Sequence, residues 1–360
     1  MSDHKREVDK LRQEISQLDE QLATTLEKRA RAARSIGELT MREPPSLPVR
    51  DRSALDALIA RSKGDLPADS LRAIFREVQA ACLGLEMAVR VAVVGPEGGA
   101  GHAAAREQFG HGATYVVLES PEAALDAVTR ERAEFAVLPY ETSIDGPVQL
   151  TILALSRSDL RIGLVRETVP TLHLFSRSGS TDDIVKVYAT AADRALAGRS
   201  LGELARDRGP LSVLDVKSPL VACQLAQEEA GAAALANEAT GAGVGLQIAR
   251  RSMLDQSHGR VRYAVVGGRP SPRTGDDSTA VVFSLHDAPG ALLEVLSQFA
   301  EREINLTRIQ SRPVEADGWA YLFFIEVVGH ATDRGIVSAF EEVKRRTKFF
   351  KVLGSYPARA

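Results

Sequence analysis

Apolar and polar positions alternate with a helical period over the first part of the chain. Apolar residues recur at steps of three and four: Val8, Leu11, Ile15, Leu18, Leu22, Leu26, Ala30, Ala33 and Ile36. This spacing predicts one helix over residues 6–39, longer than the helices of most compact domains. Its apolar stripe is expected to pack on other long helices, in the same chain or in a second one.

Three prolines within residues 41–51 end this pattern, and two shorter helical patterns follow at 52–63 and 69–89. Residues 1–90 are therefore predicted to form an all-helical domain. From Val91 onward, short β-branched runs such as VAVVG alternate with helical segments up to residue 268. That alternation predicts an α/β domain with largely parallel strand pairing.

The segment GGRPSPRTGDD, residues 267–277, is rich in Gly, Pro and charge and is interpreted as a linker. Residues 278–357 then give the order β-α-β-β-α-β, with helices at 290–302 and 333–347 and a hairpin around Asp317 and Gly318. This order predicts a small ferredoxin-like domain.

Composition narrows the class of protein. Hydrophobic residues make up 44% and charged residues 26% of the 360 residues, and the formal net charge of −3 argues against a broad nucleic-acid-binding surface. Cys82 and Cys223 each lie in an apolar helical segment, so neither a disulfide framework nor a cysteine-based zinc site is expected. The charged N-terminus lacks the apolar core of a secretory signal, which favours a cytoplasmic protein.

Residues 289–313, PGALLEVLSQFAEREINLTRIQSRP, resemble the amino-acid-binding ACT domain of phenylalanine-regulated dehydratases. The resemblance implies that the effector contacts a Gly-Ala-Leu turn and a second segment: Gly290, Ala291, Leu292, Gln310, Ser311, Arg312 and Pro313. Gly290 would allow close backbone approach, and free amides at the start of a helix can hold a carboxylate. Alternatively, Gly290 only starts a helix and Arg312 only closes a turn. The sequence leaves open whether the effector is phenylalanine or tyrosine.

The domain order resembles the fused chorismate mutase and prephenate dehydratase. The dehydratase signatures match GPEG at 95–98, with His102 following, and Glu-Thr-Ser-x-x-Gly at 141–146, where the family has Asn in place of Thr. The family's Thr-Arg-Phe signature reads Val-Arg-Tyr at 261–263. The resemblance implies these catalytic positions: Glu141, Thr142, Ser143, His173, Val261, Arg262 and Tyr263.

Two of these positions bear directly on the chemistry. In the family, the threonine at the position of Val261 is implicated in the departure of the ring hydroxyl, and valine keeps its shape without its hydrogen bond. Losing one such group typically costs about two to four powers of ten in rate. The planar fork of Arg262 suits a carboxylate, and prephenate carries two. The alternative for Arg262 is a surface ion pair, and both His102 and His173 fit structural roles equally well.

The N-terminal helices resemble the all-helical chorismate mutase, which places cations and donors around a dicarboxylate. The positions that match its substrate-binding residues are Arg12, Arg29, Asp51 and Glu86. The chain departs from the pattern at Thr40, where a lysine is expected, and at Ala54 and Leu55, where an arginine-glutamate pair is expected. Alternatively, Arg12 and Arg29 are solvated charges beside the apolar stripe.

The resemblance implies a prephenate dehydratase of phenylalanine biosynthesis, fused to a mutase-like domain and feedback-regulated by phenylalanine as an allosteric effector. The reaction needs neither a metal nor a redox cofactor, because loss of carbon dioxide supplies the electrons that expel the hydroxyl. A homodimer or homotetramer is expected. Two alternatives remain open: a non-catalytic protein that binds phenylalanine or prephenate, and an enzyme that decarboxylates prephenate without forming the aromatic ring.

Overall fold

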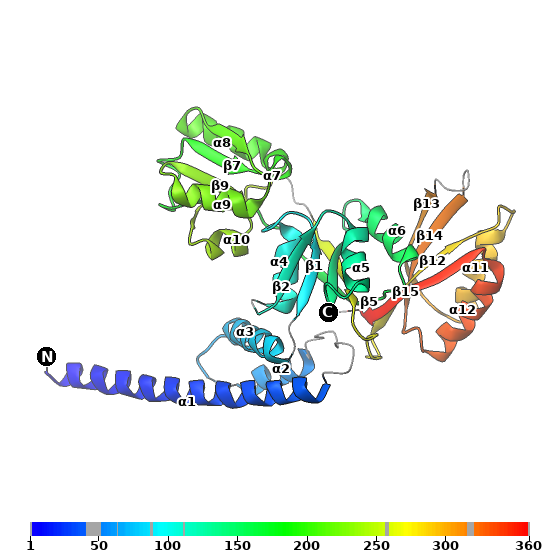
Figure 1. Ribbon diagram of the computed structural model, residues 1–360, viewed down its shortest axis with the longest axis horizontal. Coiled ribbons are helices and arrows are strands. Elements are labelled where there is room, and N and C mark those ends of the chain that lie inside the picture. Colours follow the sequence, from blue (N-terminus) through cyan, green and yellow to red (C-terminus); the bar gives the residue numbers. More distant parts are fainter. Residues whose placement is uncertain are drawn as a thin grey trace. The chain divides into compact units, whose positions relative to one another are not determined.

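The computed structural model describes residues 2–40, 52–62, 64–86, 89–110, 112–255, 259–314 and 320–358. Asp51 and the expected turn at Asp317 and Gly318 lie outside these residues. The chain divides into two compact units, Met1–Val89 with Phe109–Thr114, and Arg90–Gln108 with Tyr115–Ala360 (Figure 1).

The first unit is built from helices, as predicted: α1 (Ser2–Thr40), α2 (Arg52–Arg61) and α3 (Ala68–Glu86). Helix α1 packs on α3, and Ala33 of the apolar stripe is buried. Toward the N-terminus, the side chains of the same stripe are more than half exposed: Leu11, Ile15, Leu18 and Leu22. The stripe that predicted the helix is therefore covered over only part of its length within this chain.

The second unit contains a ten-stranded sheet with the order β13-β14-β12-β15-β5-β11-β3-β1-β2, and β4 pairs with β3. Its strands in the dehydratase-like part are β1 (Arg90–Val94), β2 (Thr114–Leu118), β3 (Phe135–Thr142), β4 (Gly146–Pro147), β5 (Ile162–Thr168) and β11 (Val261–Gly267). Helices α4 (Ala100–Phe109), α5 (Pro121–Thr129) and α6 (Gln149–Arg157) connect them.

The pairing in this sheet is mixed, which corrects the prediction of largely parallel strands. β1 runs parallel to β3, but β11 is antiparallel to both β3 and β5. The cause is the connection: β5 leads the chain out into a second lobe and β11 brings it back. Two neighbouring strands that leave and re-enter a sheet at the same end must run in opposite directions.

The second lobe has a five-stranded sheet with the order β10-β6-β9-β7-β8, which is also mixed. Its strands are β6 (His173–Ser176), β7 (Lys186–Ala189), β8 (Ser212–Asp215), β9 (Ala232–Ala236) and β10 (Gln247–Arg250). Its helices are α7 (Ala191–Leu196), α8 (Gly198–Arg208), α9 (Pro219–Glu228) and α10 (Glu238–Gly243). Apolar cores on this sheet confirm a two-lobed α/β domain.

The C-terminal part has the predicted ferredoxin-like order: β12 (Asp277–Ser284), α11 (Ala291–Ala300), β13 (Leu306–Val314), β14 (Ala320–Val328), α12 (Arg334–Arg346) and β15 (Phe349–Pro357). Both helices cover one face of its sheet, where Val281 and Phe283 of β12 join their core (Figure 1). The alternate residues Ala280 and Val282 face the other way, into a core shared with α5 and α6. The ferredoxin-like domain is thus packed on the dehydratase-like lobe through the second face of its sheet.

Two features join these parts further. β15 pairs with β5 at Gly354 and Ile162, and a Cβ at residue 354 would overlap the carbonyl oxygen of Ile162. The segment interpreted as a linker is anchored, because the buried Ser271 donates its hydroxyl hydrogen to the carbonyl of Gly163. Among the described residues, no helix is both long and apolar enough to cross a bilayer.

Candidate functional site

The register of β3 and β11 brings the predicted dehydratase residues together. Val261 lies opposite Thr142, and Arg262 lies opposite Glu141. Residues directly opposite one another in a sheet project to the same face, and successive residues project to opposite faces. Val261 and Thr142 therefore share one face, with Thr168 of β5 opposite Val261 on its other side. Arg262 and Glu141 share the reverse face.

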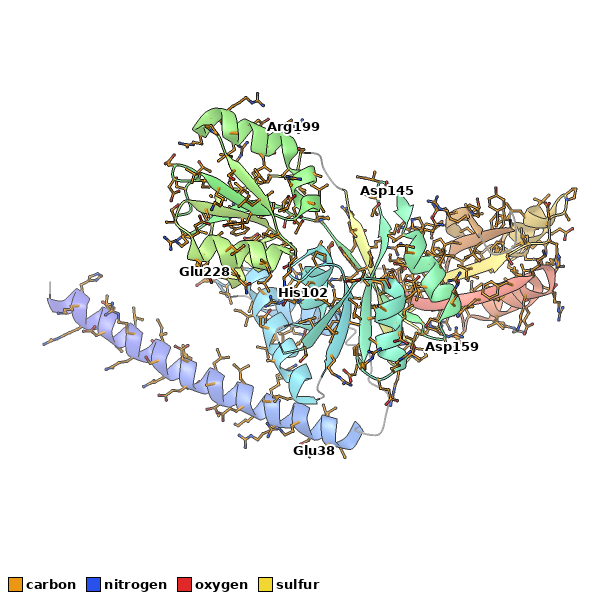
Figure 2. All side chains as sticks on the ribbon, turned by 45° about the horizontal axis from the view of Figure 1, so that its top comes forward. Glu38, His102, Asp145, Asp159, Arg199 and Glu228 are labelled. Atoms are coloured by element: carbon orange, nitrogen blue, oxygen red, sulfur yellow. The ribbon has the colours of Figure 1, made fainter. Side chains whose placement is uncertain are left out.

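The loop after β3 is held by the hydroxyls of the Glu-Thr-Ser segment. Thr142 Oγ1 accepts from the Asp145 amide at 2.8 Å and donates to the Asp145 carboxylate at 3.2 Å. Ser143 Oγ accepts from the Arg260 amide at 2.9 Å, which leaves its own O–H able to donate. Ser143 and Asp145 are exposed, and Figure 2 labels Asp145. Ser143 is therefore an accessible donor at the end of the strand pair.

On the reverse face, four charges form a cluster that is buried at Glu326 and partly exposed at Arg308: Glu141, Arg262, Arg308 and Glu326. Arg262 Nη1 donates to Glu141 Oε2 at 2.6 Å and to Glu326 Oε1 at 3.2 Å. Arg308 Nε donates to Glu141 Oε1 at 2.6 Å, and its Nη1 donates to Glu326. Each carboxylate therefore accepts from both guanidinium groups. We call this set the four-charge cluster.

Two tyrosines complete the surroundings of Glu326, which is fully buried. The hydroxyls of Tyr140 and Tyr356 both donate to its carboxylate, the former at 3.2 Å. The Tyr140 ring also lies 5.5 Å from the Arg262 guanidinium carbon, within the range of a cation–π contact. Glu326 thus accepts hydrogen bonds from two cations and two neutral hydroxyls.

Electrostatics keep these groups in their usual charge states despite burial. Burial alone would lower the pKa of Arg262, but the charge of Glu326, the hydrogen bond to Glu141 and the two tyrosines together outweigh burial, and the pKa is raised. Burial alone would raise the pKa of Glu326, but Arg262, Arg308 and the Tyr356 hydroxyl together outweigh burial, and the pKa is lowered. Burial raises the pKa of both Tyr140 and Tyr356 well above the usual value. Glu326 is therefore ionised and both tyrosines are neutral donors at neutral pH.

Arg262 was expected to face a substrate carboxylate, with a surface ion pair as the alternative. Its side chain is only 14% exposed, and two carboxylates of the chain itself engage the guanidinium. It also projects to the face opposite Val261. The structure thus separates Val261 and Arg262, although the two are adjacent in the sequence.

The other predicted catalytic residues lie in packed surroundings. Tyr263 is buried, which raises its pKa to about 12. His173 starts β6 in the second lobe, where its Nδ1 accepts from the Ser252 amide at 3.0 Å. His102 on α4, labelled in Figure 2, accepts from the Gly98 amide at 2.9 Å. Burial lowers the pKa of both histidines, so both are neutral acceptors of backbone hydrogen bonds.

The GPEG segment links the two lobes. The Gly98 carbonyl accepts from Asn237 Nδ2 at 2.6 Å and from Thr240 Oγ1 at 2.9 Å, both at the start of α10. Gly98 has a φ of +76°, and a Cβ there would come within 2.9 Å of the Leu220 amide nitrogen. The segment needs glycine both for its backbone conformation and for this close approach. The contacts of Asn237 and Thr240 with Gly98 were not predicted from the sequence. The only feature that pointed to these residues was the position of Asn237 at the start of a helix.

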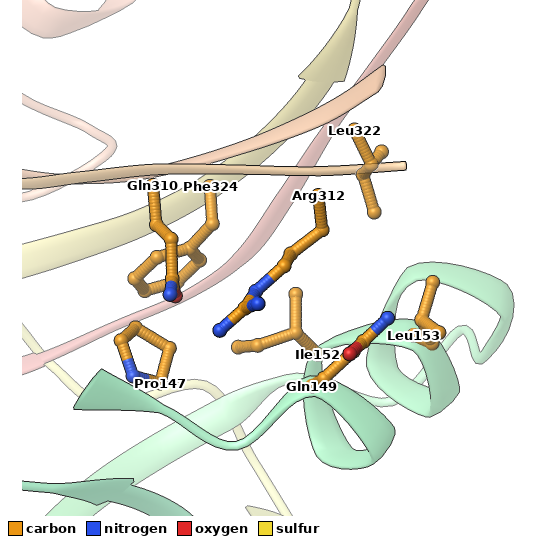
Figure 3. Close-up of a pocket in the computed structure, with 8 residues that line it drawn as sticks. All are labelled: Pro147, Gln149, Ile152, Leu153, Gln310, Arg312, Leu322 and Phe324. Atoms are coloured by element: carbon orange, nitrogen blue, oxygen red, sulfur yellow. The ribbon is translucent and has the colours of Figure 1, made fainter. Parts of the chain in front are cut away.

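A pocket lies between β13 and α6, with an empty volume of about 280 Å³ that includes open solvent (Figure 3). Its lining residues are Pro147, Gln149, Ile152, Leu153, Gln310, Arg312, Leu322 and Phe324. Gln310 and Arg312 were predicted effector contacts, and they project from β13 toward α6. Gly290, Ala291 and Leu292, at the start of α11, do not line this pocket, nor do Ser311 and Pro313.

The mutase-like residues are partly described. Arg12 is exposed and lies 3.8 Å from Asp9, and Arg29 donates to the Val78 carbonyl at 3.3 Å. Asp51 lies outside the described residues, and the side chains of Thr40, Ala54, Leu55 and Glu86 are not described. Along one helix, Arg12 and Arg29 stand roughly 25 Å apart, from a rise of about 1.5 Å per residue. One chain alone does not bring them to one small substrate.

Comparison with known families matches each part of the chain. Residues 11–87 match the model "Chorismate mutase type II", residues 91–271 match "Prephenate dehydratase" and residues 279–345 match "ACT domain". The chain is similar to the bifunctional chorismate mutase/prephenate dehydratase of Aquifex aeolicus, at 34% identity over 98% of both chains. It is 32% identical to that of Stutzerimonas stutzeri over 96% of both.

Among solved structures, a prephenate dehydratase of Arthrobacter aurescens in complex with L-Phe is 30% identical, with a TM-score of 0.63. The similarity covers 75% of this chain and 90% of that one. GqqA, described as a quorum-quenching acylase, has the same TM-score at 25% identity, over 75% of this chain and 97% of its own. The three matched domains, in order, and the full-length relatives show that the chain belongs to the family of bifunctional chorismate mutase/prephenate dehydratases.

Proposed function

We propose that this protein converts prephenate to phenylpyruvate by decarboxylative dehydration. The observation that carries the proposal is the pairing of β3 with β11, which sets Glu141, Thr142 and Ser143 against Val261 and Arg262 in a chain of this family. The carbon–carboxylate bond of the ring breaks and releases carbon dioxide. Its electron pair enters the ring and expels the ring hydroxyl, which takes up a proton and leaves as water. The reaction needs no metal or redox cofactor, because the electron pair of the broken bond is the pair that expels the hydroxyl.

The proposed reaction face is the one that carries Val261 and Thr142. Ser143 has a free O–H and is the described donor best placed to assist the leaving hydroxyl. Thr142 contributes less, since Asp145 engages its hydroxyl in both directions. Arg262 acts from the reverse face by fixing Glu141. Val261 supplies shape but no hydrogen bond, so we expect slow dehydration.

The regulatory ligand is proposed to be L-phenylalanine. Arg312 and the amides of Gln149 and Gln310 can bind the polar end of an amino acid, and the remaining lining residues are apolar. A tyrosine would bring a phenol hydroxyl against these apolar side chains at a desolvation cost. Calorimetry with both amino acids tests this choice. Tighter binding of tyrosine would contradict it.

The N-terminal unit is proposed to act as a chorismate mutase across a homodimer. The exposed stripe on α1 offers the contact, and only a second chain can bring an Arg12 near an Arg29 along antiparallel helices. Thr40 and Ala54 stand where the family's pattern has cations, and Leu55 stands where it has a glutamate, so weak turnover is expected. A cytoplasmic location is proposed as well, from the similarity to bifunctional bacterial enzymes of this family.

Product identification tests the proposed reaction. Purified protein is incubated with prephenate, and the products are separated by chromatography and identified by mass spectrometry. Phenylpyruvate supports dehydration. A decarboxylated product that keeps its hydroxyl would favour the decarboxylase alternative. Prephenate binding without any product, at high protein concentration, would favour the regulatory alternative.

A further inference from the structure

The four-charge cluster joins two domains of different function. Glu141 and Arg262 come from β3 and β11 of the dehydratase domain, and Arg308 and Glu326 come from β13 and β14 of the ACT domain. Each contact between the pairs crosses the domain boundary, from Arg262 to Glu326 and from Arg308 to Glu141. The charges thus form a closed ring, and moving any one of them disturbs contacts in both domains.

Removing the four-charge cluster from water has a free-energy cost. Removing ions from water is costly, so a buried set of ion pairs often stabilises no more than apolar residues of the same size would. The two domains already share an apolar core that includes Leu138, Val282 and Phe324. The four-charge cluster is therefore not needed to hold the two domains together. Its geometry instead fits a role in holding particular side chains in place.

The four-charge cluster lies between the proposed reaction face and the pocket lined by Gln310 and Arg312, which we call the ACT pocket. On β13, Arg308 precedes Gln310 by two residues and Arg312 by four, so the three side chains project to one face. Glu141 directly precedes Thr142, the last residue of β3, and Ser143 follows the strand. A ligand held by Gln310 and Arg312 would therefore act on the strand that also carries Arg308. Glu141 would respond to a shift of Arg308, because one nitrogen of Arg262 and one of Arg308 hold its two oxygens.

We propose that Arg308 and Glu326 are positioning residues of the dehydratase site, and that the four-charge cluster transmits occupancy of the ACT pocket to the end of β3. This inference rests on the proposed function for its chemistry and adds the route of its regulation. Glu326 holds both arginines, and Arg308 reaches Glu141 across the domain boundary. In a medium of low polarity these contacts weaken steeply with distance, so small strand movements have large effects.

The test uses the full-length protein and a charge-balanced variant. Arg308→Met combined with Glu326→Gln removes one charge of each sign and leaves the Arg262 and Glu141 pair. The matched control is Glu342→Gln on α12, whose ion-pair partners Arg345 and Arg346 lie on the same helix. Hydrogen–deuterium exchange of residues 140–145 and 310–313 is measured with and without L-phenylalanine, together with inhibition of phenylpyruvate formation.

In the wild type and in Glu342→Gln, L-phenylalanine is expected to change exchange in both segments. In the double variant the change at 310–313 persists, the change at 140–145 is lost, and inhibition is lost with it. Equal changes at 140–145 in the wild type and the double variant would overturn the proposal. So would a wild type in which L-phenylalanine leaves 140–145 unchanged.

A second variant covers the case in which the double variant does not fold. Arg308→Lys keeps the charge but replaces a fork, which reaches Glu141 and Glu326 through different nitrogens, with a single ammonium. For this variant we expect L-phenylalanine to change hydrogen–deuterium exchange less at residues 140–145 and as much as in the wild type at residues 310–313. An undiminished change at 140–145 would contradict transmission through Arg308. A wild type that forms no phenylpyruvate, yet shows the exchange pattern, would refute the proposed reaction and leave the coupling standing.

Discussion

Replacing Glu326 with glutamine is predicted to destabilise the second unit strongly. Glutamine has nearly the same volume, so no cavity forms, and the change isolates the charge. Glu326 is fully buried and accepts from Arg262, Arg308, Tyr140 and Tyr356. Without its charge, two arginines share the single carboxylate of Glu141. Removing one partner from a buried ion pair typically costs about 3–5 kcal/mol.

This loss is large enough to measure by thermal or urea unfolding. In a unit of about 265 residues, 1 kcal/mol shifts the melting temperature by about 2 °C, so a decrease of roughly 6–10 °C is expected. The control Glu342→Gln removes ion pairs that lie at the surface of α12, so its melting temperature should stay close to that of the wild type. Adding Arg308→Met to Glu326→Gln should recover most of the loss, because charge balance is restored. A Glu326→Gln melting temperature within 1 °C of the wild type would refute this reasoning.

The same charge gives a pH dependence of defined sign. The pKa of Glu326 is lowered in the folded protein, chiefly through Arg262 against the opposing effect of burial. Its stabilisation is therefore complete above the unfolded carboxyl pKa of about 4.3 and is lost as the pH falls through the folded value. Urea unfolding of wild type and Glu326→Gln at neutral and acidic pH should show the difference shrinking below about pH 4. A difference that grows in acid would contradict the assignment.

Three further predictions follow from single positions. Val261→Thr restores a hydroxyl on the proposed reaction face and should raise the rate of phenylpyruvate formation by about 100-fold or more in a steady-state assay. An unchanged rate would mean that the absence of this hydroxyl does not limit dehydration. Gly354→Ala should lower the melting temperature, because its Cβ overlaps the Ile162 carbonyl, whereas Gly335→Ala in α12 has open space and should not lower it. Leu18→Glu on the exposed stripe should reduce the mass measured by light scattering, while Gln13→Glu on the opposite face of α1 leaves it unchanged; equal masses would exclude the stripe as the dimer contact.

Much of the fold follows from local patterns in the sequence. The period of the apolar stripe from Val8 to Ile36 predicted α1, and the strand-helix order after residue 278 predicted the ferredoxin-like domain. The direction of β11 did not follow, since a sequence pattern shows that a strand exists but not which neighbours it returns between.

The candidate site was predictable only in part. Motifs identified the segments at 141–143 and 261–263, and the register confirms that they are paired. The alternation of faces along a strand already implied that Val261 and Arg262 project apart, a signal that motif matching passed over. The partner of Arg262 could not be predicted, because Glu326 lies 64 residues away in another domain. Likewise, nothing in the sequence pointed to α6 as one wall of the pocket beside Arg312.

The most direct test follows both products of the proposed reaction at once. Purified protein is supplied with prephenate labelled with carbon-13 in the ring carboxylate, and labelled carbon dioxide and phenylpyruvate are quantified over time. Dehydration predicts that the two appear in equal amounts, at a rate proportional to the protein concentration. Labelled carbon dioxide without phenylpyruvate, or neither product above the spontaneous background, would contradict it.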